Sequence, residues 1–130
     1  MQSHSEGYYT TATGQASHSE GLDTIASGAH AHVEGGYTMA SGTASHAEGS
    51  NTYANHLAQH VFGMYNIPDP SSAASSSKGN YVEIVGNGSY TTSSMTLSNA
   101  RTLDWDGNEV LAGKLTVGAA PTNNMDVATK

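Results

Sequence analysis

Small residues and larger polar residues alternate along the first half of the chain, and the alternation repeats every 14 residues. The segment S-H-S-E-G at 3–7 returns as S-H-S-E-G at 17–21, as A-H-V-E-G at 31–35 and as S-H-A-E-G at 45–49. A degraded fifth copy, Q-H-V-F-G, falls in register at 59–63. Alternation with a period of two is typical of strands that bury one face.

A second block with the same period lies between these copies, as A-T-G at 12–14, A-S-G at 26–28 and A-S-G at 40–42. A helix would have to accept two glycines per unit, each costing about 1 kcal/mol relative to alanine. Two short strands and two tight turns per unit instead predict one coil of a flattened β-solenoid, with coils about 4.8 Å apart. The expected interior is a double column of small residues: Ala12, Ala26, Ala40 and Ala54 from one strand, and Ser5, Ser19, Val33, Ala47 and Val61 from the other.

The second half of the chain has a different composition, which predicts three further segments after the β-roll of residues 1–63. Residues 64–79 contain two prolines and a serine-rich run, which are typical of a linker or a long loop. Residues 80–118 are expected to form a small domain rich in β-hairpins. Residues 119–130 are expected to form a joint to a further segment, so that the chain is a fragment of a longer fibre.

Within the small domain, β-branched and aromatic residues predict a strand at 81–85, with residues 90–97 as its partner. The turn signal Asp106-Gly107 predicts a hairpin between strands at 101–105 and 108–111. A further strand is expected at 114–117.

Charge and composition exclude several classes of function. Only 12% of the residues are charged, and four Lys plus Arg against eleven Asp plus Glu give a formal net charge of −7. Binding to phosphates needs clustered cations, so nucleic acid is not an expected partner. The absence of cysteine excludes disulfides, thiolate metal sites and a cysteine nucleophile. No apolar run approaches about 18 residues and no signal peptide is evident, so membrane insertion is not expected.

The small interior residues also bear on assembly. Phe and Trp occur once each, and a column of Ala, Ser and Val buries little apolar area at about 25 cal/mol per Å². A solenoid this thin is not expected to be stable as a single chain. Identical chains are therefore expected to associate in a closed ring.

The tandem S-H-A-E-G and A-S-G units resemble the head repeats of trimeric autotransporter adhesins, and similar repeats occur in tail fibres and appendages of bacteriophages. The resemblance covers residues 3–63. It implies an all-β fold, a left-handed parallel β-roll of 14-residue coils in a homotrimer. The number of chains and the hand come from the resemblance alone.

A second resemblance covers most of residues 60–130. The segments at 60–66, 81–88 and 98–108 are similar to a region of phage neck-appendage and tail-spike proteins. This favours a viral structural protein in the virion tail, with other fibre segments and a bacterial cell-surface receptor as partners. The alternative is the head of a bacterial trimeric autotransporter adhesin on the cell surface.

The strongest candidate site is a ladder on the outer face of the solenoid. One column, called here the His column, has an imidazole at the same position of each coil: His4, His18, His32, His46 and His60. The Glu column lies two residues further on: Glu6, Glu20, Glu34 and Glu48. Imidazoles and carboxylates are ligands of transition metals, and a stack of imidazoles changes its charge near pH 6. The favoured interpretation is a structural ladder of hydrogen bonds, with no cofactor.

Enzymatic activity is not expected, and no catalytic residue is assigned. Glu83, Asp104, Asp106 and Glu109 could form a carboxylate pair, but two of these flank a turn, where aspartate is common for backbone reasons. Two enzymatic alternatives stay open through the phage resemblance: a tail-spike depolymerase and a self-cleaving chaperone module. We expect instead a structural segment that contributes to attachment to a host surface.

Overall fold

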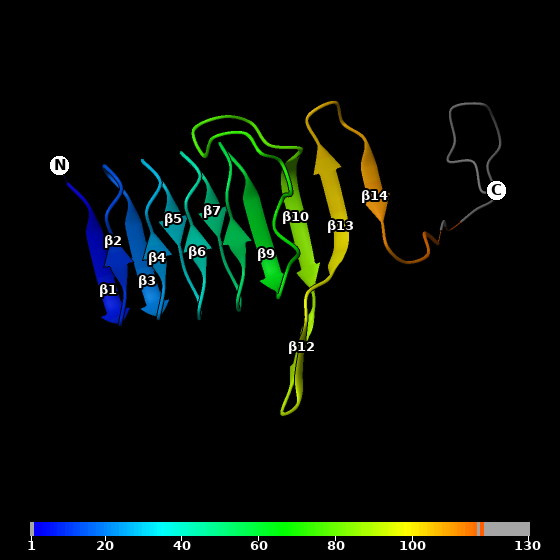
Figure 1. Cartoon of the computed structure of the whole chain (residues 1–130), viewed down its shortest axis with the longest axis horizontal. Helices are drawn as coiled ribbons and strands as arrows, with labels where there is room; N and C mark the ends of the chain where they lie inside the picture. Colours follow the sequence, from blue (N-terminus) through cyan, green and yellow to red (C-terminus); the bar gives the residue numbers. More distant parts are fainter. Residues whose placement is uncertain (1, 117, 119–130) are drawn as a thin grey trace.

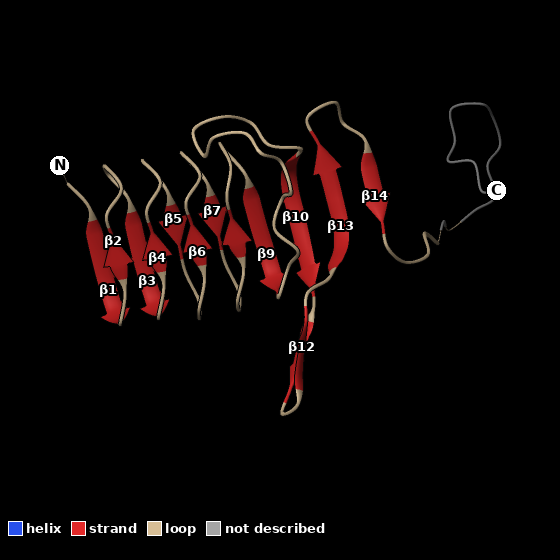
Figure 2. Ribbon diagram, viewed as in Figure 1, coloured by secondary structure: helices blue, strands red, loops and turns tan. Residues whose placement is uncertain are grey.

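The computed structural model describes residues 2–116 and 118, and its regular elements in that part of the chain are all β-strands (Figure 2). The described residues contain no helix that is long and apolar enough to cross a membrane. Residues 119–130, where a joint is predicted, lie outside the described part of the chain.

Residues 3–64 form a β-solenoid of about four turns, each built from two strands (Figure 1). The strands of the first sheet are β1 (His4–Tyr8), β3 (His18–Leu22), β5 (His32–Val33), β7 (His46–Ala47) and β9 (His60–Met64). The strands of the second sheet are β2 (Thr11–Ala12), β4 (Ile25–Ala26), β6 (Met39–Ala40) and β8 (Tyr53–Ala54). All these strands pair in parallel, and each residue lies beside the residue 14 positions later. The predicted coil is confirmed.

The interior of the solenoid is the predicted double column, with little exposed surface at Ala26, Ala40, Ala54, Ser19, Val33, Ala47 and Val61. Ser5 is exposed and Ala12 is half-buried, because the first coil has a neighbouring coil on one side only. Threonines also line the interior at Thr24, Thr38 and Thr52. Their hydroxyls donate to the carbonyl oxygens of Glu20, Glu34 and Glu48 at 2.9–3.2 Å, which satisfies polar atoms that would otherwise be costly to bury.

Non-glycine residues take part in the tight turns of the solenoid. Two non-glycine residues per coil have a positive φ of 47–58°, in two series spaced by 14: Tyr9, Asp23, Tyr37, Asn51 and Tyr65, and Ala16, His30, Ala44 and Ala58. Such residues rarely adopt the left-handed conformation, so the stacked turns impose it through the hydrogen bonds between coils. For example, Tyr37 N donates to Leu22 O at 2.8 Å.

The first sheet continues beyond the repeats. Strand β10 (Tyr81–Asn87) pairs in parallel with β9, with Ile84 beside Val61 and Gly86 beside Gly63. Ile84 is fully buried and covers the open end of the interior column. Strands β13 (Asn99–Asp104) and β14 (Glu109–Leu111) then add in antiparallel fashion, so one eight-stranded sheet runs from β1 to β14 (Figure 1).

Two details of the predicted small domain are wrong, while the hairpin at Asp106-Gly107 is confirmed. Residues 90–97 do not pair with β10; β11 (Ser89–Thr91) and β12 (Ser94–Thr96) form a separate exposed hairpin that projects from the sheet (Figure 1). The antiparallel partner of β10 is β13, whose Arg101 forms an ion pair with Glu83. Residues 114–116 form no strand, and Val117 lies outside the described residues.

The loop between β9 and β10 closes the end of the second sheet. The side-chain amide of Asn66 replaces a missing strand: its Oδ1 accepts from Tyr53 N at 2.8 Å and its Nδ2 donates to Tyr53 O at 3.2 Å. Nearby, the buried Asp69 accepts hydrogen bonds from Gln59 Nε2 at 3.1 Å, Tyr81 N at 2.8 Å and Ser71 N at 2.9 Å. The loop predicted at 64–79 is therefore a capping structure with its own buried polar contacts.

Candidate functional site

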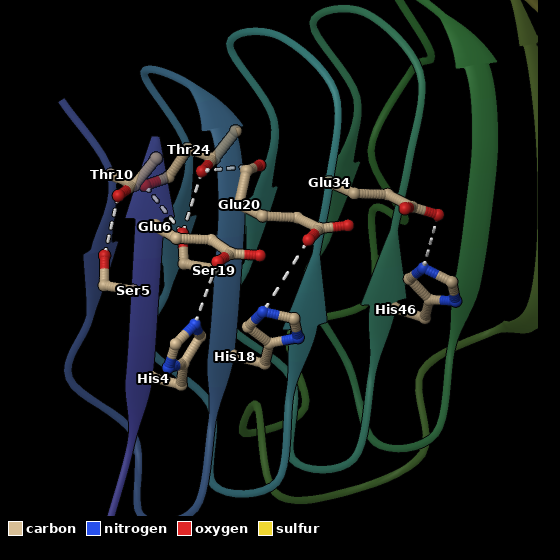
Figure 3. A network of polar contacts seen from close by, with 10 residues as sticks. All are labelled: His4, Ser5, Glu6, Thr10, His18, Ser19, Glu20, Thr24, Glu34 and His46. Carbon is tan, nitrogen blue, oxygen red and sulfur yellow. Dashed lines mark hydrogen bonds and ion pairs between the residues drawn. The ribbon is translucent and has the colours of Figure 1, made fainter. Parts of the chain in front are cut away.

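The His column forms a stack along the outer face of the first sheet, and Figure 3 shows three of its members, His4, His18 and His46. Neighbouring rings lie 4.6–5.0 Å apart between centroids, and from His18 to His60 they are within 16° of parallel. The parallel register of β1, β3, β5, β7 and β9 produces this stack, because it places equivalent residues of successive coils side by side. The structure therefore places the five histidines of the predicted ladder side by side on successive coils.

The Glu column lies beside the His column, since residues i and i+2 of a strand face the same side. The carboxylates of Glu6, Glu20 and Glu34 line an open groove together with Gly7, Gly21 and Gly35. At the first coil, His4 and Glu6 have side chains 64% and 59% exposed, whereas from His18 onward the paired side chains are only about one-third exposed. Stacking therefore withdraws the inner ladder groups from solvent.

The ion pairs of the ladder change direction along the stack. Within the first two coils, a histidine contacts the carboxylate of its own coil: His4 Nε2 lies 3.3 Å from Glu6 and His18 Nε2 lies 3.8 Å from Glu20. In the later coils, a histidine contacts the carboxylate of the preceding coil: His46 Nε2 lies 3.6 Å from Glu34 and His60 Nε2 lies 3.1 Å from Glu48. Sequence spacing predicted the two columns but not this reversal.

The carboxylates of the Glu column influence one another. The pKa of Glu34 is raised above 4.5, chiefly by its hydrogen-bonding contact with the Glu48 carboxyl group, with burial and Glu20 adding to the effect. Burial also acts to raise the pKa of Glu48, but hydrogen bonds with His60 and Glu34 outweigh it and the pKa is lowered. At the exposed end, the hydrogen bond from His4 lowers the pKa of Glu6. The upward pKa shift therefore falls on Glu34, in the middle of the column, where carboxylates of adjacent coils lie close together.

The position of His46 within the stack predicts that the stability of the solenoid depends on pH. Its pKa lies below 6.5 because burial disfavours the charged ring, and His32 and His60 lower it further, against an opposing effect of Glu48. Between this lowered pKa and 6.5, the unfolded chain binds more protons than the folded chain. The contribution of His46 to stability is therefore complete above pH 6.5 and falls as the pH drops through that window. We expect the melting temperature to fall between about pH 7.5 and about pH 5.5, and to fall less in a His46→Gln variant.

Circular dichroism melting at the two pH values measures this effect, with His30→Gln as the control because His30 is an exposed turn residue outside the column. Glu34 acts in the opposite direction, because its pKa is raised in the folded state. Its contribution to stability therefore grows as the pH falls through the range between that raised pKa and 4.5. A Glu34→Gln variant separates the two contributions. An equal fall in His46→Gln and in the unchanged chain would contradict the assignment to His46.

Three groups of ladder residues bring potential metal ligands within 4.8 Å of one another in the described part of the chain. They are His4, Glu6 and His18; Glu20, His32 and Glu34; and Glu34, His46 and Glu48. The first group is largely exposed, whereas the other two are half-buried. The sequence-based prediction placed possible metal ligands in these columns, and the structure brings nitrogen and oxygen donors from adjacent coils together.

The carboxylates considered for catalysis are each engaged in local structure, apart from Asp106. Asp104 accepts hydrogen bonds from Asp106 N, Asn108 N and Asn108 Nδ2 at 2.8–2.9 Å, and these bonds lower its pKa. Glu83 and Glu109 both form ion pairs with Arg101. Asp106 occupies the exposed turn between β13 and β14. These contacts stabilise the hairpin and its attachment to β10.

A buried polar cluster at the end of the solenoid was not predicted from the sequence. It consists of His56, Gln59, Asn66 and Asp69, all at most 3% exposed. His56 takes the position that glycine occupies at Gly14, Gly28 and Gly42, where each glycine packs against the backbone of the next coil. In the sequence, the change from glycine to histidine at position 56 was the signal for this cluster, because only the last coil has room for a side chain there.

Comparison of the chain with models of protein families, curated proteins and solved structures found no match.

Proposed function

We propose that this chain is a structural segment of a homotrimeric bacteriophage tail fibre or tail appendage, in which a left-handed β-roll carries further segments and contributes to attachment to a host surface. The observation that carries the proposal is the thin interior of the solenoid, which holds Ala, Ser and Thr and, among larger apolar residues, Val33, Val61 and Ile84. A repeat array with so little buried apolar area gains stability from neighbouring chains. Trimerisation would supply that area.

Apolar side chains on the outside of the described structure support association. The outer face of the second sheet has a column of half-buried side chains, Ile25, Met39 and Tyr53, that stack in register. Several other large side chains are more than half exposed: Tyr8, Tyr9, Tyr37, Tyr90, Met95 and Val110. Contiguous apolar surface on a soluble protein typically marks a protein contact. We assign the Ile25–Met39–Tyr53 column to the contact between chains.

The repeat resemblance alone fits a bacterial trimeric adhesin head equally well. The similarity of residues 81–88 and 98–108 to phage appendage proteins favours the phage fibre. In either case a rigid trimer presents each surface feature three times, and three weak contacts on one stalk raise the overall avidity without any catalytic chemistry.

Multi-angle light scattering on the purified chain at neutral pH tests the proposal. We expect a mass near three times 13.4 kDa. Met39→Glu introduces a charge into the assigned contact and is expected to lower the mass toward that of one chain, whereas Gln15→Glu, at an exposed turn, is expected to leave the trimer intact. A folded, monodisperse monomer of the unchanged chain would contradict the trimeric fibre.

A further inference from the structure

The ladder contains five imidazoles but only four carboxylates, so one histidine has no ion-pair partner. Because the pairing direction reverses between His18 and His46, the unpaired histidine is His32, which lies in the middle of the stack. Among the described residues, no carboxylate oxygen lies within 4.0 Å of its ring nitrogens, while Glu20 and Glu34 flank it and contact His18 and His46 instead.

The surroundings of His32 leave one of its nitrogen atoms unsatisfied. The ring is stacked between His18 and His46, at centroid distances of 4.8 Å and 4.6 Å. Its Nε2 atom, like those of His18 and His46, is buried and has no hydrogen-bond partner in the described structure, but unlike them it also has no carboxylate oxygen within 4.0 Å. A buried polar atom without a partner costs about 1–3 kcal/mol, so a ligand at this nitrogen would stabilise the fold.

The charge around His32 favours a cation. Residues 1–63 contain five Asp and Glu and neither Lys nor Arg, so no lysine or arginine charge lies within the repeats. Ligand oxygens of Glu20 and Glu34, and of Glu34 and Glu48, lie within 4.8 Å of one another, so carboxylates of adjacent coils stand close together along the column. A divalent ion bound between Glu20 and Glu34 would neutralise the repulsion along the column and use the free nitrogen of His32.

We propose that Glu20, His32 and Glu34 form a binding site for a divalent transition-metal ion of the zinc class, with His32 Nε2 and one oxygen of each carboxylate as ligands. Imidazole nitrogen and carboxylate oxygen are both donors that Zn²⁺ takes, and three protein ligands with an open fourth position are a known zinc arrangement. Ca²⁺ and Mg²⁺ prefer oxygen ligands throughout, so the imidazole nitrogen of His32 favours a transition metal over either of them.

The geometry needs only a small adjustment to bind the ion. The three ligand atoms lie within 4.8 Å of one another, and a tetrahedral Zn²⁺ site with bonds of about 2.1 Å places its ligand atoms about 3.4 Å apart. The Glu20 and Glu34 side chains are 35% and 37% exposed, so they can rotate toward the ion without unpacking the interior. Since Glu20 belongs to the second coil and His32 and Glu34 to the third, the ion joins adjacent coils.

The test is isothermal titration of the full chain with ZnCl₂ near neutral pH, together with melting curves with and without the metal. We expect one ion per chain to bind first and to raise the melting temperature. His32→Gln and Glu20→Gln should each weaken binding by at least about tenfold and remove most of the shift in melting temperature. The matched controls are His30→Gln and Asp23→Asn, which change an exposed histidine and an exposed carboxylate in the neighbouring turns and should bind Zn²⁺ like the unchanged chain.

The isosteric change at the partly exposed Glu20 keeps the test decisive if His32→Gln does not fold. Absence of Zn²⁺ binding to the unchanged chain would overturn the proposal. It would equally be overturned if the His32 and Glu20 variants bound like the unchanged chain, or if His30→Gln lost binding instead. An equal thermal shift with Mg²⁺ or Ca²⁺ would show general screening of the carboxylates and would overturn the assignment to a coordinated ion.

Discussion

Replacing Gly35 by alanine is expected to abolish stable folding of the solenoid or to lower its stability by more than about 3 kcal/mol. Gly35 has a φ of +102°, which side chains of L-residues rarely adopt. A β-carbon at this position would also lie 2.1 Å from the carbonyl oxygen of Gly49 in the next coil. That oxygen accepts the hydrogen bond from Gly36 N at 2.9 Å, so the clash cannot be relieved without opening the contact between coils.

The adjacent Gly36 provides a matched control within the same coil. It has no positive φ, and an added β-carbon would have no heavy atom within 4 Å. Gly36→Ala is therefore expected to keep the melting temperature within a few degrees of the unchanged chain, or to raise it slightly by restricting the unfolded state. Thermal melting followed by circular dichroism compares the two. Similar melting temperatures for both variants would mean that the coils are not packed as closely as described.

Replacing Asp69 by alanine is expected to detach the capping loop and to cost about 3 kcal/mol. The Asp69 carboxylate is buried and accepts from Gln59 Nε2, Tyr81 N and Ser71 N. Its removal leaves these donors without an acceptor at the end of the solenoid, apart from the bond that Gln59 Nε2 also donates to Tyr81 O. The backbone amide of Tyr81, at the start of β10, should lose most of its protection.

Hydrogen exchange measured by mass spectrometry or NMR locates this effect. We expect faster exchange at Tyr81 and in the loop at 66–80, with protection retained in the coils at 18–54. Asp106→Ala, in the exposed turn between β13 and β14, is the control and should change neither exchange at Tyr81 nor stability by more than about 0.5 kcal/mol. Unchanged exchange at Tyr81 in Asp69→Ala would show that the loop is held by other contacts.

The 14-residue period determined the repeating part of the fold, because it is a local pattern copied several times. Each copy gives the same two strands, and stacking in register is the arrangement that buries Ala26, Ala40 and Ala54 together. The same register carries His18, His32 and His46 into one column. A one-residue slip would turn every interior side chain to the outside, so the pattern leaves little freedom.

Tertiary structure decided how the strands after the repeats are arranged. Strand β10 continues the solenoid sheet after an interruption, and the only sequence signal was the spacing of Ile84 and Gly86, which matches that of Val61 and Gly63. Which strand fills an open sheet edge depends on the edges that are free in space. Residues 90–97 therefore looked like a partner for β10 in the sequence, whereas β13 occupies that edge.

In the ladder too, some features follow from the sequence and others from the tertiary structure, here at the level of single side chains. The sequence alone determined which residues form the two columns, since a fixed period and a fixed strand spacing place them there. Only the tertiary structure decided which carboxylate each histidine contacts: His18 contacts Glu20 of its own coil, whereas His46 contacts Glu34 of the preceding coil. That choice leaves His32 unpaired between Glu20 and Glu34. Local periodicity therefore defines the scaffold of this protein, and contacts between neighbouring coils decide which side chains of the ladder pair with one another.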